Sequence, residues 1–211
     1  DSCDSVVAIS KVTEDIVTSN DDQDIHLVIV LCDHEVEAVT EIQFNGTSIP
    51  LDAIDGSGNV ISGDYADRAR IKIHLGTDTQ TADADLMAET SVTSDFRGRG
   101  VSYLYVTLQF DRDVYPSSVP TITAWVKGRK ILDPRDATTR WTANGALFAY
   151  DYLTLPLDAL TPGVGVATAD IDEAYLNASS NIADEMVTTT ALVDTITAGD
   201  DALDLISLGG V

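Results

Sequence analysis

Hydrophobic and polar residues alternate along much of the chain, and a repeat of two is typical of β-strands with one buried face. The clearest example is the segment 101–110, in which Leu104, Val106 and Leu108 alternate with polar or tyrosine residues. The segment 25–31 is apolar almost throughout, which predicts a strand at the centre of a sheet or barrel. Further strands are expected at 5–16, 39–44, 48–51, 70–75, 121–126 and 129–132.

Glycine and proline mark the turns between these strands. Asn45-Gly46 predicts a tight hairpin between its flanking strands. Lys127-Gly128 predicts a second tight turn, in which Gly128 adopts a positive φ and the chain returns as a further strand. The prolines and serines of 111–120 predict a loop, because proline cannot donate to a strand ladder.

Three helices interrupt the strand pattern. A short one is expected at 82–89, and Asn144 is a good N-cap for a second over 145–153. The second helix is apolar on nearly every side, so we expect it to be buried. The third is expected at 171–187. Its predicted capping box is Asp170 and Glu173, and its predicted apolar face is Ile171, Ala174, Tyr175, Ala178, Ile182 and Met186.

The amino-acid composition restricts the classes of function that the chain can have. The 211-residue chain is 44% hydrophobic, enough for a sizeable core, and 35 acidic against 12 basic residues give a net charge of −23. We expect no specific nucleic-acid binding, because such binding depends on lysine and arginine. The excess of acidic residues favours a solvated, charged surface. A more specific hypothesis is that some of the carboxylates line a tube through which DNA slides. Residues 141–211 contain no lysine or arginine at all.

The two cysteines, Cys3 and Cys32, make no disulfide framework, which predicts assembly in a reducing cytoplasm. No run of 18 apolar residues predicts a membrane span, and the first residues do not resemble a secretion signal. We expect residues 1–187 to form one β-rich body, with the helical part 141–187 packed on it. Residues 188–211 are expected to begin a further β unit of a longer chain.

Three strings occur in order along the chain: GVSYLYV, then VYPSSVPTITAWVKGRKILDPR, then WTANGALFAYDYLT. Together they resemble the central part of the tail tip attachment protein J family of long-tailed phages. The segments 27–46 and 74–83 extend the resemblance to roughly three quarters of the chain. The family usually has Asn-Pro where this chain has Asn144-Gly145, a departure that weakens the helix start.

The resemblance implies a mainly β (α+β) fold with barrel-like domains of the phage baseplate hub type and a few packed helices. It implies a structural component of the virion, located at the tail tip, that forms a ring closing the tail tube and anchors host-recognition parts. Implied partners are further copies in a homotrimer, the distal tail protein, other tail tip proteins and the C-terminus of the tape measure. Motif residues with an expected structural role are Gly128, Asp133, Pro134, Arg135, Trp141, Asn144, Asp151, Tyr152 and Leu153.

Lys127, Arg129 and Lys130 form a dense basic cluster in an otherwise acidic chain. Opposite charges steer and align interfaces, so we expect this cluster to contact an acidic patch on a neighbouring copy. The alternative is a solvated hairpin tip. We predict no catalytic residue, metal or cofactor: the Asp-rich loop 52–67 lacks the spacing of an EF-hand, and His34-Glu35 has no second histidine at helical spacing.

Two other functions remain open at this stage. Trp125 and Trp141 could stack on a sugar in a carbohydrate-binding or receptor-binding β module, although tryptophan in such positions more often belongs to a core. A cell-wall hydrolase would need paired carboxylates in a cleft, and the many acidic residues leave that pairing undetermined. The three histidines, His26, His34 and His74, lie in or beside predicted strands and indicate no serine triad.

Overall fold

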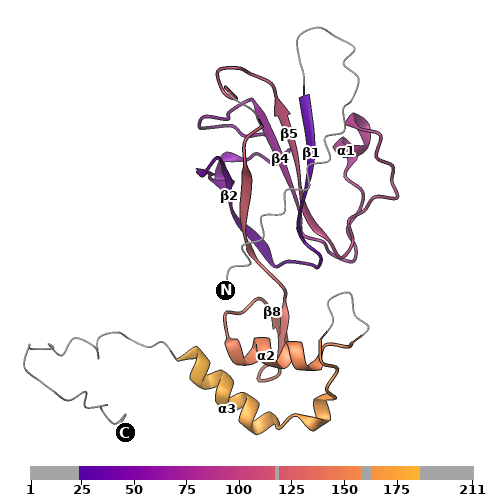
Figure 1. The fold of residues 1–211 in the computed structure, drawn as a ribbon, viewed down its shortest axis with the longest axis vertical. Helices are drawn as coiled ribbons and strands as arrows, with labels where there is room; N and C mark the ends of the chain where they lie inside the picture. Colours follow the sequence, from indigo (N-terminus) through magenta and orange to yellow (C-terminus); the bar gives the residue numbers. More distant parts are fainter. Residues whose placement is uncertain (1–23, 117–118, 158–162, 186–211) are drawn as a thin grey trace, which may run out of the picture.

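The computed structural model describes residues 24–116, 119–157 and 163–185. Figure 1 shows two sheets in one part of the molecule and a helical lobe beyond them. The sheets contain, in spatial order, β1 (Asp24–Cys32), β5 (Ser102–Gln109) and β4 (Ala69–His74), and β3 (Thr47–Ile49), β2 (Ala38–Phe44) and β6 (Ile122–Lys127). The helical lobe contains β7 (Ile131–Asp133), β8 (Thr138–Arg140), α2 (Gly145–Thr154), η2 (Thr168–Asp170) and α3 (Glu173–Asp184). The remaining elements are η1 (Leu51–Ala53) and α1 (Ala84–Glu89).

The prediction of a mainly β fold with a few helices is confirmed, but the barrel-like form is wrong for the described residues. Both three-stranded sheets are antiparallel and open, with β1 and β4 at the edges of the first one. The predicted central place of β1 is therefore also wrong, since β5 lies between β1 and β4. The apolar run of β1 is explained by burial on both faces, because α1 covers part of its outer face.

The main core lies between the two sheets. Strand alternation directs Leu27 and Ile29 of β1, and Leu104 and Val106 of β5, toward the second sheet. Phe44 of β2 meets them from the other side and is completely buried. This two-layer arrangement removes one face of each strand from water, which is the main source of its stability.

β5 is buried on its second face as well, which the sequence pattern did not predict. Tyr103 and Tyr105 point away from the main core and are covered by Leu86 of α1 in a second apolar cluster. Asp83 is the N-cap of α1 and accepts hydrogen bonds from the backbone N–H of Asp85 and Leu86. A central strand with a helix on its outer face has no solvent side.

The turn predictions had opposite outcomes. The Asn45-Gly46 hairpin is confirmed, with φ values of 51° and 80° at its two residues. The predicted turn at Lys127-Gly128 is wrong: β6 pairs with β2, and β7 pairs with β8. Gly128 is not among the residues with a positive φ. The backbone N–H of Glu37, the residue before β2, donates to the carbonyls of both Lys127 and Gly128, so this segment holds the chain where the return strand was expected.

The three helices lie near their predicted positions, but the predicted burial of the helix after Asn144 is wrong. α2 begins after the predicted N-cap Asn144, yet Leu147 is its only buried residue. The N-cap of α3 is Asp172 instead of the predicted Asp170, because the Asp172 side chain accepts from the N–H of Ala174 and Tyr175. The predicted apolar face of α3 points largely to solvent, with Tyr175 76% and Ile182 68% exposed.

Several predictions fall outside the described residues: the strand at 5–16, Cys3, Met186 and the β unit at 188–211.

Candidate functional site

The basic cluster lies where the chain leaves the sheets for the helical lobe. Arg129 forms an ion pair with Asp151 of α2, with 3.1 Å between Nε and Oδ2, and Lys130 pairs with Glu35. The hydrogen bond to Glu35 raises the pKa of Lys130. Two of the three cations are therefore already neutralised within the chain.

The third cation of this cluster, Lys127, is exposed, and its Nζ lies 5.4 Å from the centre of the Trp141 ring. This cation–π contact places Trp141 against the strand end that leads into the lobe. Asp151 is partly buried by its surroundings, and this desolvation raises its pKa despite Arg129. The contact of the whole cluster with another copy stays a prediction.

A second charged site joins the parts of the helical lobe. Asp133 at the end of β7 is 2% exposed, and its two oxygens accept two hydrogen bonds from the Arg135 guanidinium, at 2.9 and 2.7 Å. Arg140 of β8 donates to the same carboxylate at 3.0 Å. Arg135 also pairs with Asp184 near the end of α3, at 2.7 Å. Together these four residues form what we call the Asp133 node.

Asn144 connects this node to the start of α2. Its side-chain oxygen accepts from the backbone N–H of Ala146 and Leu147, and its Nδ2 donates to the Ser180 carbonyl at 2.8 Å and to Asp184 at 2.7 Å. Hydrogen bonds from Asn144 and Arg135 lower the pKa of Asp184. The pKa of Asp133 is likewise lowered, mainly by Arg135. The carboxylates are therefore charged at neutral pH and hold β7, α2 and α3 together.

The other motif residues lie around the same lobe. Pro134 borders a hollow beside α3, whereas Tyr152 and Leu153 of α2 are 57% and 38% exposed. Asp133, Arg135 and Asn144 are thus brought together by the fold, and Tyr152 and Leu153 are left on the surface.

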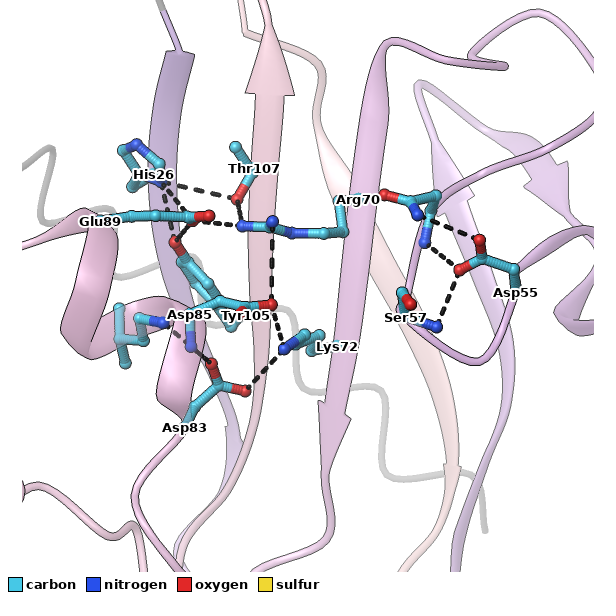
Figure 2. Close-up of polar contacts among 12 residues, drawn as sticks. His26, Asp55, Ser57, Arg70, Lys72, Asp83, Asp85, Glu89, Tyr105 and Thr107 are labelled. Carbon is cyan, nitrogen blue, oxygen red and sulfur yellow. Dashed lines mark hydrogen bonds and ion pairs between the residues drawn. The ribbon is translucent and has the colours of Figure 1, made fainter.

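A third polar site covers the outer face of the first sheet (Figure 2) and was not predicted from the sequence. The strand register places His26 beside Thr107 and Thr107 beside Arg70, across three strands. Arg70 pairs with Glu89 of α1, and the Tyr105 hydroxyl donates to Glu89 at 2.6 Å. His26 lies 2.8 Å from the Tyr105 hydroxyl.

The same face continues toward the start of α1. Lys72 pairs with Asp85 and lies 3.7 Å from Asp83, and His74 lies 2.9 Å from Asp83. One signal in the sequence could have revealed the site. The strand ARIKIH puts three basic or titratable residues on one face, and the helix after it carries two acidic residues and an acidic N-cap. These pairs fix α1 on the sheet.

The pKa values of the two carboxylates Asp83 and Glu89 agree with a charged, paired state. Burial opposes ionisation of Asp83 and Glu89, but hydrogen bonds and nearby cations outweigh it, so both pKa values are lowered. Burial lowers the pKa of His74 more than Asp83 raises it. Desolvation raises the pKa of Tyr103 to about 12 and raises that of Tyr105 further.

These shifts predict a two-step loss of stability in acid. His74 is neutral in the folded chain, so stability should fall as the pH drops from 6.5 through its lowered pKa, because the unfolded chain takes up the proton first. A second loss should follow below about pH 4, as Asp83 and Glu89 are protonated. Urea denaturation at a series of pH values measures both steps. The variant His74→Gln should lack the first step and keep the second, and an unchanged first step would contradict this assignment.

In the Asp-rich loop 52–67, the carboxylate of Asp55 is already used in hydrogen bonds within the loop. Asp55 accepts hydrogen bonds from the backbone N–H of Ser57 and Asn59 and from the Asn59 side chain. Figure 2 shows this loop apart from the network under α1. Among the described residues, no group of three or more histidine, cysteine or acidic side chains is placed to hold a metal ion.

Trp125 on β6 is 42% exposed and Trp141 is partly buried. The assignment of Trp125 to the core is therefore wrong, because its strand position faces away from the first sheet. Within the part of the chain that the structure describes, no helix is both long and apolar enough to cross a membrane.

Comparison with known proteins gives little beyond this geometry. No family model matches the chain, and no curated protein matches it. One similar solved structure is a chain of the "Virion of native gene transfer agent (GTA) particle", with 19% sequence identity and a TM-score of 0.35. The alignment covers 72% of this chain but 28% of that one. A similarity of this size carries no argument about fold or function.

Proposed function

We propose that this chain is a structural component of a phage-type virion, a segment of the tail tip hub that helps to close the tail tube and anchor host-recognition parts. In this role it would assemble as a homotrimer beside the distal tail protein, other tip proteins and the C-terminus of the tape measure. It would act by geometry and carry out no reaction. The support comes from the ordered sequence resemblance and from the place of its motif residues in the fold.

One observation carries the proposal. Asp133 and Arg135 belong to the Asp133 node, and Asn144 donates to Asp184 of the same node. These three residues come from two of the resembling strings. This convergence gives the motif residues a structural task, which is to join a strand pair to two helices. The charged groups of the node and of the α1 face are paired with one another, as expected of groups that hold elements together.

Exposed apolar side chains support an assembled state. Tyr152, Tyr175 and Ile182 are each more than half exposed on the helices of the lobe. Leu153 and Tyr175 also border one hollow between the two helices, and adjoining exposed apolar side chains are typical of contacts with other proteins. A helical lobe that buries so little of its own apolar surface is expected to bury more of it in an assembly.

The proposal is tested on particles from the organism that encodes the chain. An antibody raised against the 211-residue chain should label one end of the tail in electron micrographs, and mass spectrometry should find the chain in purified particles. Antibody absorbed with the purified chain serves as the control. Absence from purified particles, or peptidoglycan release by the chain above background, would overturn the proposal.

The exposure of Trp125 favours carbohydrate binding as a second candidate function. The same purified chain can be screened on an array of host surface glycans. Binding that is lost in Trp125→Ala would support a receptor-binding module, whereas background signal from the unaltered chain would dismiss it.

A further inference from the structure

An apolar groove runs between α2 and α3, with a volume of about 400 Å³. Its walls include Ala149, Tyr150, Leu153, Ile171, Tyr175 and Leu176. Leu153 is 38% and Tyr175 76% exposed, so these walls face solvent in the isolated chain. Covering them with apolar atoms would be favourable, because apolar surface would leave water.

The charge beside this groove restricts what can occupy it. Asp172 lines the groove, and Asp170 and Glu173 lie next to it in sequence and are exposed. Residues 141–211 provide no lysine or arginine to balance these carboxylates. An occupant that brings an apolar side chain together with positive charges would match both the walls and the rim.

The chain carries such a segment in the loop after α1. Phe96 is 40% exposed, and the exposed Arg97 and Arg99 follow it. The two Nε groups donate to the carbonyls of Ser94 and Gln80, and neither arginine forms an ion pair with any described residue. The guanidinium charges are therefore available to a partner.

The shape of this loop is fixed by close packing. Gly98 has a φ of +61°, and a Cβ added there would lie 2.4 Å from the Tyr103 ring. Phe96 contacts the same ring, with 5.5 Å between ring centres. A loop held in one shape loses little conformational entropy when it binds, which favours its use as a contact.

We infer that the loop 94–99 of one copy docks in the α2–α3 groove of a second copy, with Phe96 on the apolar walls and Arg97 and Arg99 on the acidic rim. Figure 1 shows the loop after α1 beside the first sheet, whereas α2 and α3, which line the groove, lie in the helical lobe, so a chain cannot fill its own groove without rearranging. The contact joins two different surfaces and is therefore head to tail, the kind that builds a ring when its rotation closes. This inference rests on the proposed function in one respect, which is that the partner is another copy of the chain.

Other exposed cations fit the groove less well. Arg112 borders a hollow of about 490 Å³ beside Phe110, and a concave surface cannot enter a groove. Lys127 is a single charge that lies over the Trp141 ring. Only the loop after α1, among the described residues, combines an exposed large apolar side chain with two arginines outside any ion pair.

A charge swap tests the contact in the full chain. In sedimentation experiments at low salt, the unaltered chain should form dimers and larger species as its concentration rises. Arg97→Glu with Arg99→Glu should weaken self-association about tenfold or more, and Asp170→Arg with Glu173→Arg should do the same. Among the described residues, the side chains of Asp170 and Glu173 form no hydrogen bond or ion pair that these changes would break. Mixing the two double variants should restore association, because one acidic loop then meets one basic rim.

The matched control is Arg112→Glu, which makes the same charge change elsewhere and should leave self-association unchanged. A chain that stays monomeric at every concentration, a mixture that fails to recover, or an equal loss in Arg112→Glu or Lys127→Glu would overturn the inference. If the loop variant still enters particles as efficiently as the unaltered chain, the inference fails while the proposed function stands. If the chain self-associates as expected but is absent from purified particles, the inference stands while the proposed function fails.

Discussion

Replacing Leu86 by alanine is expected to lower the free energy of unfolding by about 3 kcal/mol and to release α1 from the sheet. Leu86 is 2% exposed and is the one buried apolar side chain of α1. A helix of six residues has little stability of its own, so it depends on this contact and on the ion pairs beneath it. Urea denaturation measures the loss, and hydrogen exchange of the α1 amides locates it.

A second measurement separates local release from general destabilisation. Burial under α1 raises the pKa of Tyr103 to about 12, so release of the helix should return it toward 10 in an ultraviolet titration of the folded chain. Met87→Ala is the matched control, because Met87 is only partly buried and should cost less than about 1 kcal/mol. A raised tyrosine pKa that survives in Leu86→Ala would contradict this account of the outer face.

Replacing Asp133 by asparagine is expected to destabilise the helical lobe by about 2 to 4 kcal/mol, with little effect on the two sheets. Asparagine keeps the shape but loses the negative charge that Arg135 and Arg140 share. The amide would also place a donor against a guanidinium, which donates only. Hydrogen exchange should therefore speed up first in α2 and α3, whose ends meet at the node.

Asp136→Asn provides the control for this change. Asp136 is exposed and also pairs with Arg140, at 2.8 Å, but it bridges no other element of the lobe. Exposed pairs at this spacing contribute a few tenths of a kcal/mol, so Asp136→Asn should be nearly neutral. Equal effects of the two substitutions, or faster exchange in β1 and β5 instead of the helices, would show that the node does not hold the lobe together.

Self-association and lobe stability are linked by the groove, since α2 and α3 form its two walls. A chain with Asp133→Asn is therefore expected to lose part of its self-association as well as its local protection. Leu86→Ala acts on the sheet side and changes the loop that carries Phe96. The two substitutions thus disturb opposite halves of the inferred head-to-tail contact.

Local signals in the sequence determined most of the described elements, with β8 among those that they missed. Alternation predicted β4 and β5, Asn45-Gly46 predicted the hairpin between β2 and β3, and Asn144 predicted the start of α2. These signals act within a few residues, through backbone conformation and capping hydrogen bonds, so they can be read without a partner. The basic cluster was likewise visible, although its pairing was not.

Only the tertiary structure decided which strands pair and which faces are covered. β6 pairs with β2, and the paired residues, from Phe44 with Ile122 to Ala38 with Lys127, are far apart in the sequence. The expected return strand β7 pairs instead with β8. The helices α2 and α3 keep large apolar side chains exposed, and a polar contact, from Asn144 Nδ2 to the Ser180 carbonyl, connects α3 to the start of α2. The periodicity of apolar residues indicates which face of a helix or strand is more stable away from water. The neighbour that covers this face is determined by residues distant in the sequence, or by another chain.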